Sequence, residues 1–128
     1  MADAIVYPVK APEVRPKLVC GRFFPNGTST SALSFEGEGV AGVVRTGSAG
    51  IFTVTLTQGY ASLISAVASV QHVTVVDLKP QFDTFNNLGT TDAVTFNITL
   101  LAVATATDMT GDADSSVSFM LLFNESAA

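Results

Sequence analysis

The chain has 128 residues, of which 48% are hydrophobic and 13% are charged, and its formal net charge is −5. A typical soluble domain carries about 25% charged residues, so few charges are available here to solvate an isolated surface. The length and hydrophobicity exclude an intrinsically disordered chain and predict one domain with its own core. The acidic balance argues against nucleic-acid binding, which needs a basic surface, and the single cysteine, Cys20, excludes an intramolecular disulfide framework.

The first sixteen residues contain Pro8, Pro12 and Pro16 and lack the unbroken apolar core of a signal peptide. Proline fixes φ and has no backbone N–H, so residues 1–16 are expected to form an extended arm. The apolar side chains of this arm indicate docking on a neighbouring subunit or a larger surface; an edge strand of the same domain is the alternative. The longest apolar stretch, residues 63–76, is shorter than the ~20 residues that span a bilayer, so synthesis in a cytoplasm and no membrane partner are expected.

Alternation of apolar and polar residues predicts strands along the rest of the chain. In residues 51–57, Phe52, Val54 and Leu56 alternate with threonines, which is typical of a strand with one buried face. A short helix is predicted only at residues 58–66. The other predicted strands are residues 17–24, 40–45, 63–76, 94–100 and 116–123, with turns at 25–27, 46–50, 86–89 and 110–112. The pattern predicts an all-β fold, in which residues 17–128 form a single-domain, antiparallel, jelly-roll-like β-sandwich or barrel preceded by the extended arm.

The outward-facing positions of two predicted strands change from polar to apolar toward one end. In the penultimate strand the polar positions give way to Leu101 and Val103, and in the last strand they give way to Met120 and Leu122. Contiguous apolar patches are rarely left in water, so either a loop or the long strand covers them or they form a subunit interface. Because few charges remain to solvate a monomer, we expect self-association through these four side chains.

Residues 37–42 match the letter pattern G-x-G-x-x-G, but they precede a valine-rich strand and not a helix. Dinucleotide binding needs a helix N-terminus at this place, so a hairpin or bulge is the better interpretation. His72 is the only histidine, and Asp77 follows it on the long strand. A histidine on a β surface is expected there, with a catalytic general base as the alternative. No catalytic residue or cofactor site is predicted.

Two further features have competing interpretations. Asp108, Asp112 and Asp114 cluster in one turn, which indicates a solvated loop or, alternatively, a weak cation site. Cys20 lies between Val19 and Gly21 in an apolar stretch, which predicts a buried small hydrophobic residue and not a reactive thiol.

Three stretches carry a resemblance to a known class of protein. They are the run Gly21-Arg22-Phe23-Phe24-Pro25-Asn26-Gly27, the run from Val43 to Leu56 and the run from Tyr60 to Ala66. This series resembles small virion structural proteins of tailed bacteriophages, in particular capsid decoration (cement) proteins. The resemblance implies a non-enzymatic β-rich homotrimer that is made in the bacterial cytoplasm and binds the outer surface of the assembled capsid. There it would clamp adjacent subunits of the major capsid protein, often with an N-terminal arm.

The apolar and basic side chains of the arm and its junction are the expected contacts with the shell. The alternative function is a tail-fibre or host-recognition β module that binds surface glycans, although the chain has no Trp and two Tyr residues. A small esterase or nuclease would depend on His72 alone. The predicted shell contacts are Ile5, Val6, Tyr7, Val9, Lys10, Arg15 and Lys17.

Overall fold

The computed structural model describes residues 16–72, 77–109 and 115–124, and all regular elements in these ranges are β-strands. The predicted all-β fold is therefore confirmed. The strands are β1 (Pro16–Phe23), β2 (Phe35–Glu36), β3 (Val40–Arg45), β4 (Ile51–Leu56), β5 (Ser62–Gln71), β6 (Lys79–Asn86), β7 (Thr95–Ala102), β8 (Thr105–Ala106) and β9 (Ser116–Asn124).

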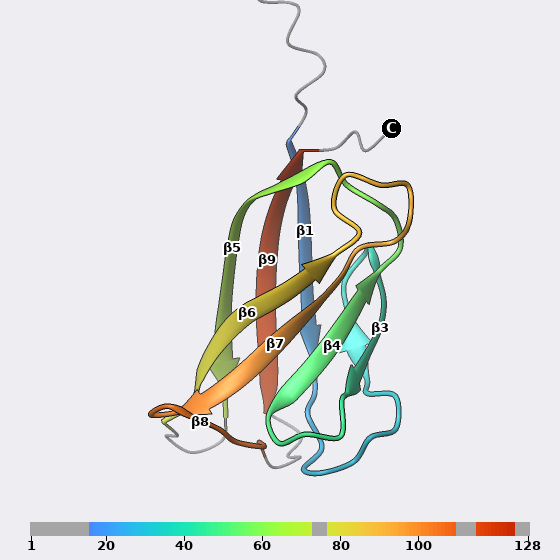
Figure 1. Ribbon diagram of the computed structural model, residues 1–128. Helices are drawn as coiled ribbons and strands as arrows, with labels where there is room; N and C mark the ends of the chain where they lie inside the picture. The colour runs from blue at the N-terminus through green and yellow to red at the C-terminus, as the bar shows by residue number, and fades with distance from the viewer. Residues whose placement is uncertain (1–15, 73–76, 110–114, 125–128) are drawn as a thin grey trace, which may run out of the picture.

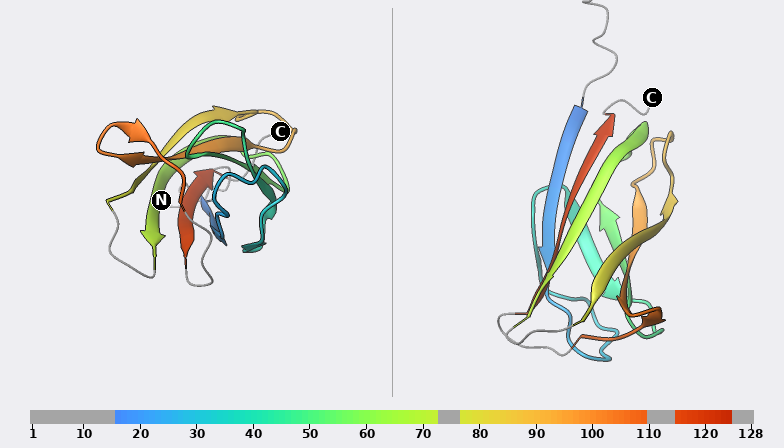
Figure 2. Two further views of the ribbon diagram at one scale, coloured as in Figure 1. Left: turned by 90° about the horizontal axis from the view of Figure 1, so that it is seen from below. Right: turned by 90° about the vertical axis from the view of Figure 1, so that its left-hand side faces the viewer.

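The strands form two antiparallel sheets that pack face to face, which confirms the predicted sandwich (Figure 1). The four-stranded sheet has the order β2-β1-β9-β5, and the five-stranded sheet has the order β3-β4-β7-β6 with β8 paired to β7. β5 belongs to the four-stranded sheet and β6 to the five-stranded sheet, and Figure 2 shows both strands on the same side of the sandwich in its right-hand view. These two strands run next to each other along one side of the sandwich without forming a ladder.

The strand order has a simple relation to the immunoglobulin sandwich. An immunoglobulin domain places strands A, B, E and D in one sheet and C, F and G in the other. The order β3-β4-β7-β6 corresponds to A-B-E-D, and β5-β9-β1 corresponds to C-F-G. The chain is therefore arranged as a circular permutant of that order, with the last strand moved to the N-terminal end as β1. It has the Greek-key connectivity that immunoglobulin domains and jelly rolls share.

The alternating residues that predicted the strands supply the core. In β4, Phe52, Val54 and Leu56 are buried, while the intervening threonines are half-buried. Two aromatic clusters cross the interior, one around Phe96 and Phe119 (ring centroids 5.6 Å apart) and one formed by Tyr60 stacked on Phe123 at 4.3 Å. The two sheets are held together mainly by apolar burial, which contributes roughly 1.5–3 kcal/mol for each large side chain that is fully buried.

The predicted helix at residues 58–66 is wrong. The chain instead bends at residues 57–58 and at Ala61, on either side of Gly59 and Tyr60, and enters β5 at Ser62. The helical spacing arises because Tyr60, between the bends, and Leu63, in the strand, both point toward the core. Pairing of β5 with β9 over nine residue pairs outweighs the weak local preference for a helix.

Strand β6 is absent from the sequence prediction, and its sequence explains why. Lys79, Pro80 and Asp83 interrupt the apolar alternation, and a bulge between Asp83 and Asn86 shifts the pattern. Proline is tolerated in a strand at a sheet edge, which is where β6 lies. Of the predicted long strand at residues 63–76, the structure forms β5 from Ser62 to Gln71, and residues 73–76 lie outside the described residues.

The glycines of residues 37–42 form a turn and a bulge, so the bulge interpretation of this pattern is confirmed, whereas the hairpin is not formed, because β2 and β3 belong to different sheets. Gly37 and Gly39 have φ of 130° and 89°, which L-residues rarely adopt, and they connect β2 to β3. A bulge follows between Val40 and Gly42. A Cβ at Gly37 would collide with the carbonyl oxygen of Cys20, so the glycine lets this turn lie against β1.

Candidate interaction surface

The outer face of the four-stranded sheet carries an apolar surface contributed by β1, β9 and β5. Leu18, Val67 and Met120 are 54%, 57% and 46% exposed. The strand register brings them together, because Leu18 pairs with Leu122, and Met120 pairs with Cys20 on one side and Val67 on the other. We call these five side chains, Leu18, Cys20, Val67, Met120 and Leu122, the outer apolar face.

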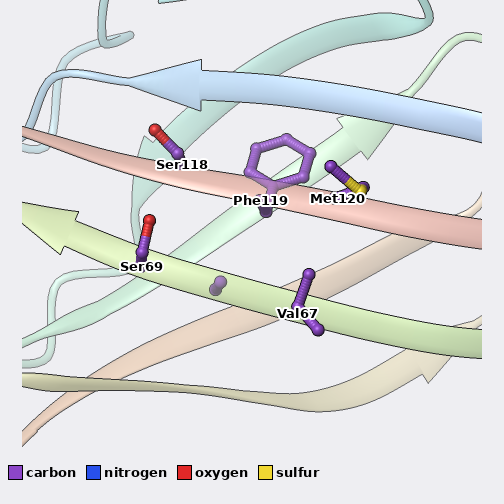
Figure 3. Close-up of a pocket in the computed structure, with 6 residues that line it drawn as sticks. Val67, Ser69, Ser118, Phe119 and Met120 are labelled. Atoms are coloured by element: carbon purple, nitrogen blue, oxygen red, sulfur yellow. The ribbon is translucent and has the colours of Figure 1, made fainter.

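The sequence of β9 explains why this face is apolar at only one end. Phe119 and Leu121 point inward, and Met120 and Leu122 therefore point outward. Toward the other end Ser118 pairs with Arg22 and Ser69, so the row becomes polar. Figure 3 shows Val67 and Met120 on neighbouring strands, with Ser69 and Ser118 farther along the same two strands. A shallow hollow of about 290 Å³ lies between these strands.

The outer face of the five-stranded sheet has the opposite character. Thr53 donates a hydrogen bond from Oγ1 to Oδ1 of Asn97 at 2.9 Å, and Thr99 donates from Oγ1 to Oδ2 of Asp83 at 3.3 Å. Asn97 pairs with Thr53 and Asp83 across β4, β7 and β6, so a row of hydrogen-bonded polar side chains crosses these three strands. The two faces of the sandwich therefore differ, and the apolar one is suited to contact with a protein surface.

The structure divides the four residues predicted for self-association between the two sheets. Met120 and Leu122 belong to the outer apolar face, whereas Leu101 lies in β7 of the five-stranded sheet. Val103 is 85% exposed in the tight turn between β7 and β8, where its φ is 61°. The four side chains do not form one continuous surface, because the two strands that carry them belong to opposite layers.

Leu18 and Val67 are surface residues that sequence reasoning missed. The consecutive residues Leu18, Val19 and Cys20 are all apolar and so occupy both faces of the strand, and alternation alone does not show which side is buried. In the structure Val19 is 2% exposed and points inward, which places Leu18 and Cys20 outside. Apolar residues at both the inward and the outward positions of this strand are the sequence signal that indicates an exposed apolar face.

The prediction of a buried Cys20 is wrong, because this cysteine is exposed. Its neighbours in the sequence are apolar, but Cys20 has the outward parity and pairs with Met120 across the ladder. Of the predicted shell contacts, Lys17 is exposed at the start of β1, beside Leu18. The others, from Ile5 to Arg15, lie outside the described residues.

Asp108 is engaged in a clamp between loops at one end of the sandwich. Its carboxylate accepts hydrogen bonds from Nε and Nη2 of Arg45 at 2.8 and 2.9 Å and from the backbone N–H of Gly50 at 2.7 Å. Arg45 also donates from Nη1 to the carbonyl oxygen of Thr28 at 3.3 Å. The hydrogen bonds from Arg45 hold the pKa of the Asp108 carboxyl below its usual range. Asp108 therefore stabilises loops through Arg45, while Asp112 and Asp114 of the predicted cluster lie outside the described residues.

His72 borders a second hollow, of about 340 Å³, close to this clamp. Asp77 and Asp108 also line it, so the structure brings His72 near both carboxylates. The remaining lining is mainly apolar and includes Leu78 and Met109. Thr107 supplies the one hydroxyl group among the described lining residues. The pair His72 and Asp77 thus lies at a loop end of the sandwich, away from the outer apolar face.

No protein-family model, curated protein sequence or solved structure matches this chain. Within residues 16–72, 77–109 and 115–124, no three His, Cys, Asp or Glu side chains are grouped closely enough to hold a metal ion. The same part of the chain contains no helix that is long and apolar enough to cross a membrane.

Proposed function

We propose that this chain is a non-enzymatic structural protein of a tailed-phage virion. As a trimer, it binds the outer surface of the assembled capsid and clamps neighbouring major capsid subunits. The observation that carries this proposal is the outer apolar face, on which Leu18, Val67 and Met120 are each about half exposed. The sequence resemblance to decoration proteins supplies the kind of partner.

The composition of this surface resembles a protein interface more than a ligand site. Its centre contains leucine, valine, methionine and cysteine side chains with no charge among them. Charges lie at its border, where Arg22 and Glu36 form an exposed ion pair and Lys17 adjoins Leu18. An apolar centre that includes methionine and is surrounded by a polar rim is typical of protein–protein contacts.

The mechanism follows from binding to one state of the shell. A protein that binds the assembled, expanded lattice and not its precursor stabilises that lattice by mass action. Each copy would bury the outer apolar face against a capsid subunit, and many copies would act together to resist internal pressure. The described residues need no cofactor for this activity, because burial of apolar surface supplies the free energy.

Replacing Met120 by aspartate tests the proposal. The matched control is Val44→Asp, since Val44 is 39% exposed on the other sheet. Both variants keep their inward-facing neighbours, so circular dichroism should show folded protein. We expect Met120→Asp to lower occupancy on mature heads of the phage that encodes the chain at least tenfold, and Val44→Asp to leave it unchanged. Absence of wild-type binding to mature heads would reject the proposal.

A glycan-binding module is a second candidate, favoured by one observation. The loop between β1 and β2 encloses a hollow of about 290 Å³, and its wall includes Phe24, Asn26, Ser29 and Ser31. An aromatic ring beside amide and hydroxyl groups is a combination that can bind sugars. Binding on a glycan array that Phe24→Ala abolishes, together with no binding to capsids, would favour this function instead.

A further inference from the structure

We propose that β5 accepts an additional strand, formed by residues 5–9 of a neighbouring copy, and that this exchange of N-terminal segments closes the trimer. The inference deepens the proposed function and rests on it for the number of copies. The pairing itself depends on features of β5, of β6 and of the N-terminal sequence.

The edge of β5 differs from the other three sheet edges. Natural edge strands avoid unwanted pairing by being short, by carrying charges or proline, or by bulging. At the other end of its sheet β2 has two residues, and in the five-stranded sheet β3 bulges at Val40–Gly42. The remaining edge, β6, contains Lys79, Pro80 and Asp83.

By contrast, β5 is ten residues long and contains neither a charged residue nor proline. It has one bulge, near its start, and is regular from Ser65 to Gln71. Among the described strands it pairs only with β9. The opposite edge therefore offers a row of backbone donors and acceptors to an incoming strand.

The core is also incompletely covered on this side. Every partly buried apolar residue that packs against the described core belongs to β5, to β6 or to the residues flanking β6. By comparison, Phe52, Val54 and Leu56 in β4 are almost completely buried. Figure 2 shows β5 and β6 adjacent on the side that faces the viewer in its right-hand view. We call this set the β5–β6 seam: Leu63, Ala66, Ala68, Val70, Leu78, Phe82, Phe85 and Leu88.

The N-terminal sequence has the pattern that such a strand requires. In an extended segment Ile5, Tyr7 and Val9 share one face, and this face could cover the seam. Pro8 lies between them and is compatible with an added edge strand, because one edge of that strand stays unpaired. The six residues from 10 to 15 can span about 20 Å when extended, which is enough to reach an adjacent molecule.

The positions of the prolines favour addition of residues 5–9 to β5 of a neighbouring copy over addition to β5 of the same copy. Pro16, Asn124 and Ser62 lie in one row across β1, β9 and β5. A strand added to β5 of the same copy would lie three inter-strand distances from β1, which is about 14 Å. To pair there in the antiparallel sense, the chain would also have to reverse direction before it enters β1. Pro12 and Pro16 bias their preceding residues toward extended conformations, which disfavours that reversal. A head-to-tail exchange between copies can close a ring of three.

The first test changes the seam and measures the mass of the full chain by light scattering. Ala68→Lys places a charge in the seam, whereas Ser69→Lys adds the same charge on the exposed side of β5. We expect Ala68→Lys to lower the mass from three chains to one and Ser69→Lys to remain trimeric. In case Ala68→Lys fails to fold, Ile5→Ser combined with Tyr7→Ser and Val9→Ser should give the same threefold loss of mass. A monomeric wild type, or a triple variant that remains trimeric, overturns the inference.

The second test identifies which copy supplies the strand. One chain carries Cys20→Ser and Val6→Cys, and a co-expressed chain carries Cys20→Ser and either Ser65→Cys or Val67→Cys. Side chains on paired strands approach closely enough for a disulfide, so oxidation should give a reducible two-chain band. Val44→Cys on the other sheet is the control and should give none.

A third chain carries Cys20→Ser, Val6→Cys and Val67→Cys together. If this chain cross-links within itself and the co-expressed pair gives no two-chain band, the strand belongs to the same copy and the inference is wrong. If the triple variant stays trimeric but no longer binds capsids, then Ile5, Tyr7 and Val9 contact the capsid shell and not β5 of a neighbouring copy. The Met120→Asp measurement on capsids reports on the proposed function separately, so the failure of one proposal is distinguishable from that of the other.

Discussion

Phe119 of β9 lies directly over Gly21 of β1. The two residues are cross-strand partners, and a Cβ placed on Gly21 would be 2.5 Å from the ring Cζ of Phe119. The ring cannot move away easily, because it packs against Phe23 and Phe96 with centroid distances of 6.5 and 5.6 Å. The absence of a side chain at Gly21 therefore lets an aromatic ring fill the space between the two sheets.

Gly21→Ala should destabilise the protein, because the added methyl group overpacks a rigid part of the core. We expect a loss of roughly 1–3 kcal/mol in the free energy of unfolding, measured by urea denaturation. Gly42→Ala is the control, since no atom lies within 4 Å of a Cβ there and its φ is not positive. Equal stability of the Gly21→Ala variant and the wild type would contradict the close packing of Phe119.

The clamp between Arg45 and Asp108 should make stability depend on acid. The hydrogen bonds from Arg45 lower the pKa of Asp108 in the folded state, so the stabilisation is complete above the unfolded pKa of about 3.9. It is then lost as the pH falls through the lower folded pKa. We expect Asp108→Asn to reduce the thermal midpoint at pH 7, and the difference from wild type to shrink progressively below about pH 4.

Glu36→Gln is the matched control for that measurement. Glu36 also pairs with an arginine, Arg22, but the two side chains are 61% and 41% exposed. Exposed ion pairs contribute about 0–1 kcal/mol, so this variant should change the midpoint much less than Asp108→Asn. A larger effect from Glu36→Gln would mean that burial of the pair does not determine its contribution.

The stack of Tyr60 on Phe123 should be a major source of stability. The rings are 4.3 Å apart with an interplanar angle of 8°, and both residues are at most 2% exposed. Phe123→Ala should cost about 3–5 kcal/mol, because it removes a large buried ring and leaves a cavity. Val67→Ala, at a 57% exposed position in a regular part of β5, should cost much less. Urea denaturation of both variants measures the contrast.

Cys20 should react with a maleimide in the free protein and become protected on the capsid. It is exposed and lies beside Met120 in the outer apolar face. We expect labelling of the free protein to be complete within minutes, and labelling of capsid-bound protein to be at least tenfold slower. A thiol introduced at Val44 is the control and should label at the same rate in both states. Equal protection of both thiols would contradict binding through the outer apolar face.

Local pattern accounts for the parts of the fold that the sequence predicted. Alternation predicts strands β4, β7 and β9, because their inward residues are apolar and their outward residues are polar over at least part of each strand. Strand β6 is not predicted, because Pro80 and a bulge interrupt its alternation of apolar and polar residues. Both features are typical of a strand at the edge of a sheet. Tyr60 produced a false helical spacing because the bends on either side direct it inward.

The amino-acid sequence by itself determined the fold class, the inward-facing residues of most strands and the low charge of the chain. Only the tertiary structure decided which outward residues become neighbours, as when Leu18, Met120 and Val67 meet from three strands. It also paired Arg45 with Asp108, 63 residues away, and left the long uncharged β5 at an edge. The physical reason is that alternation is a property of one strand, whereas register and sheet order depend on contacts between segments far apart in the chain.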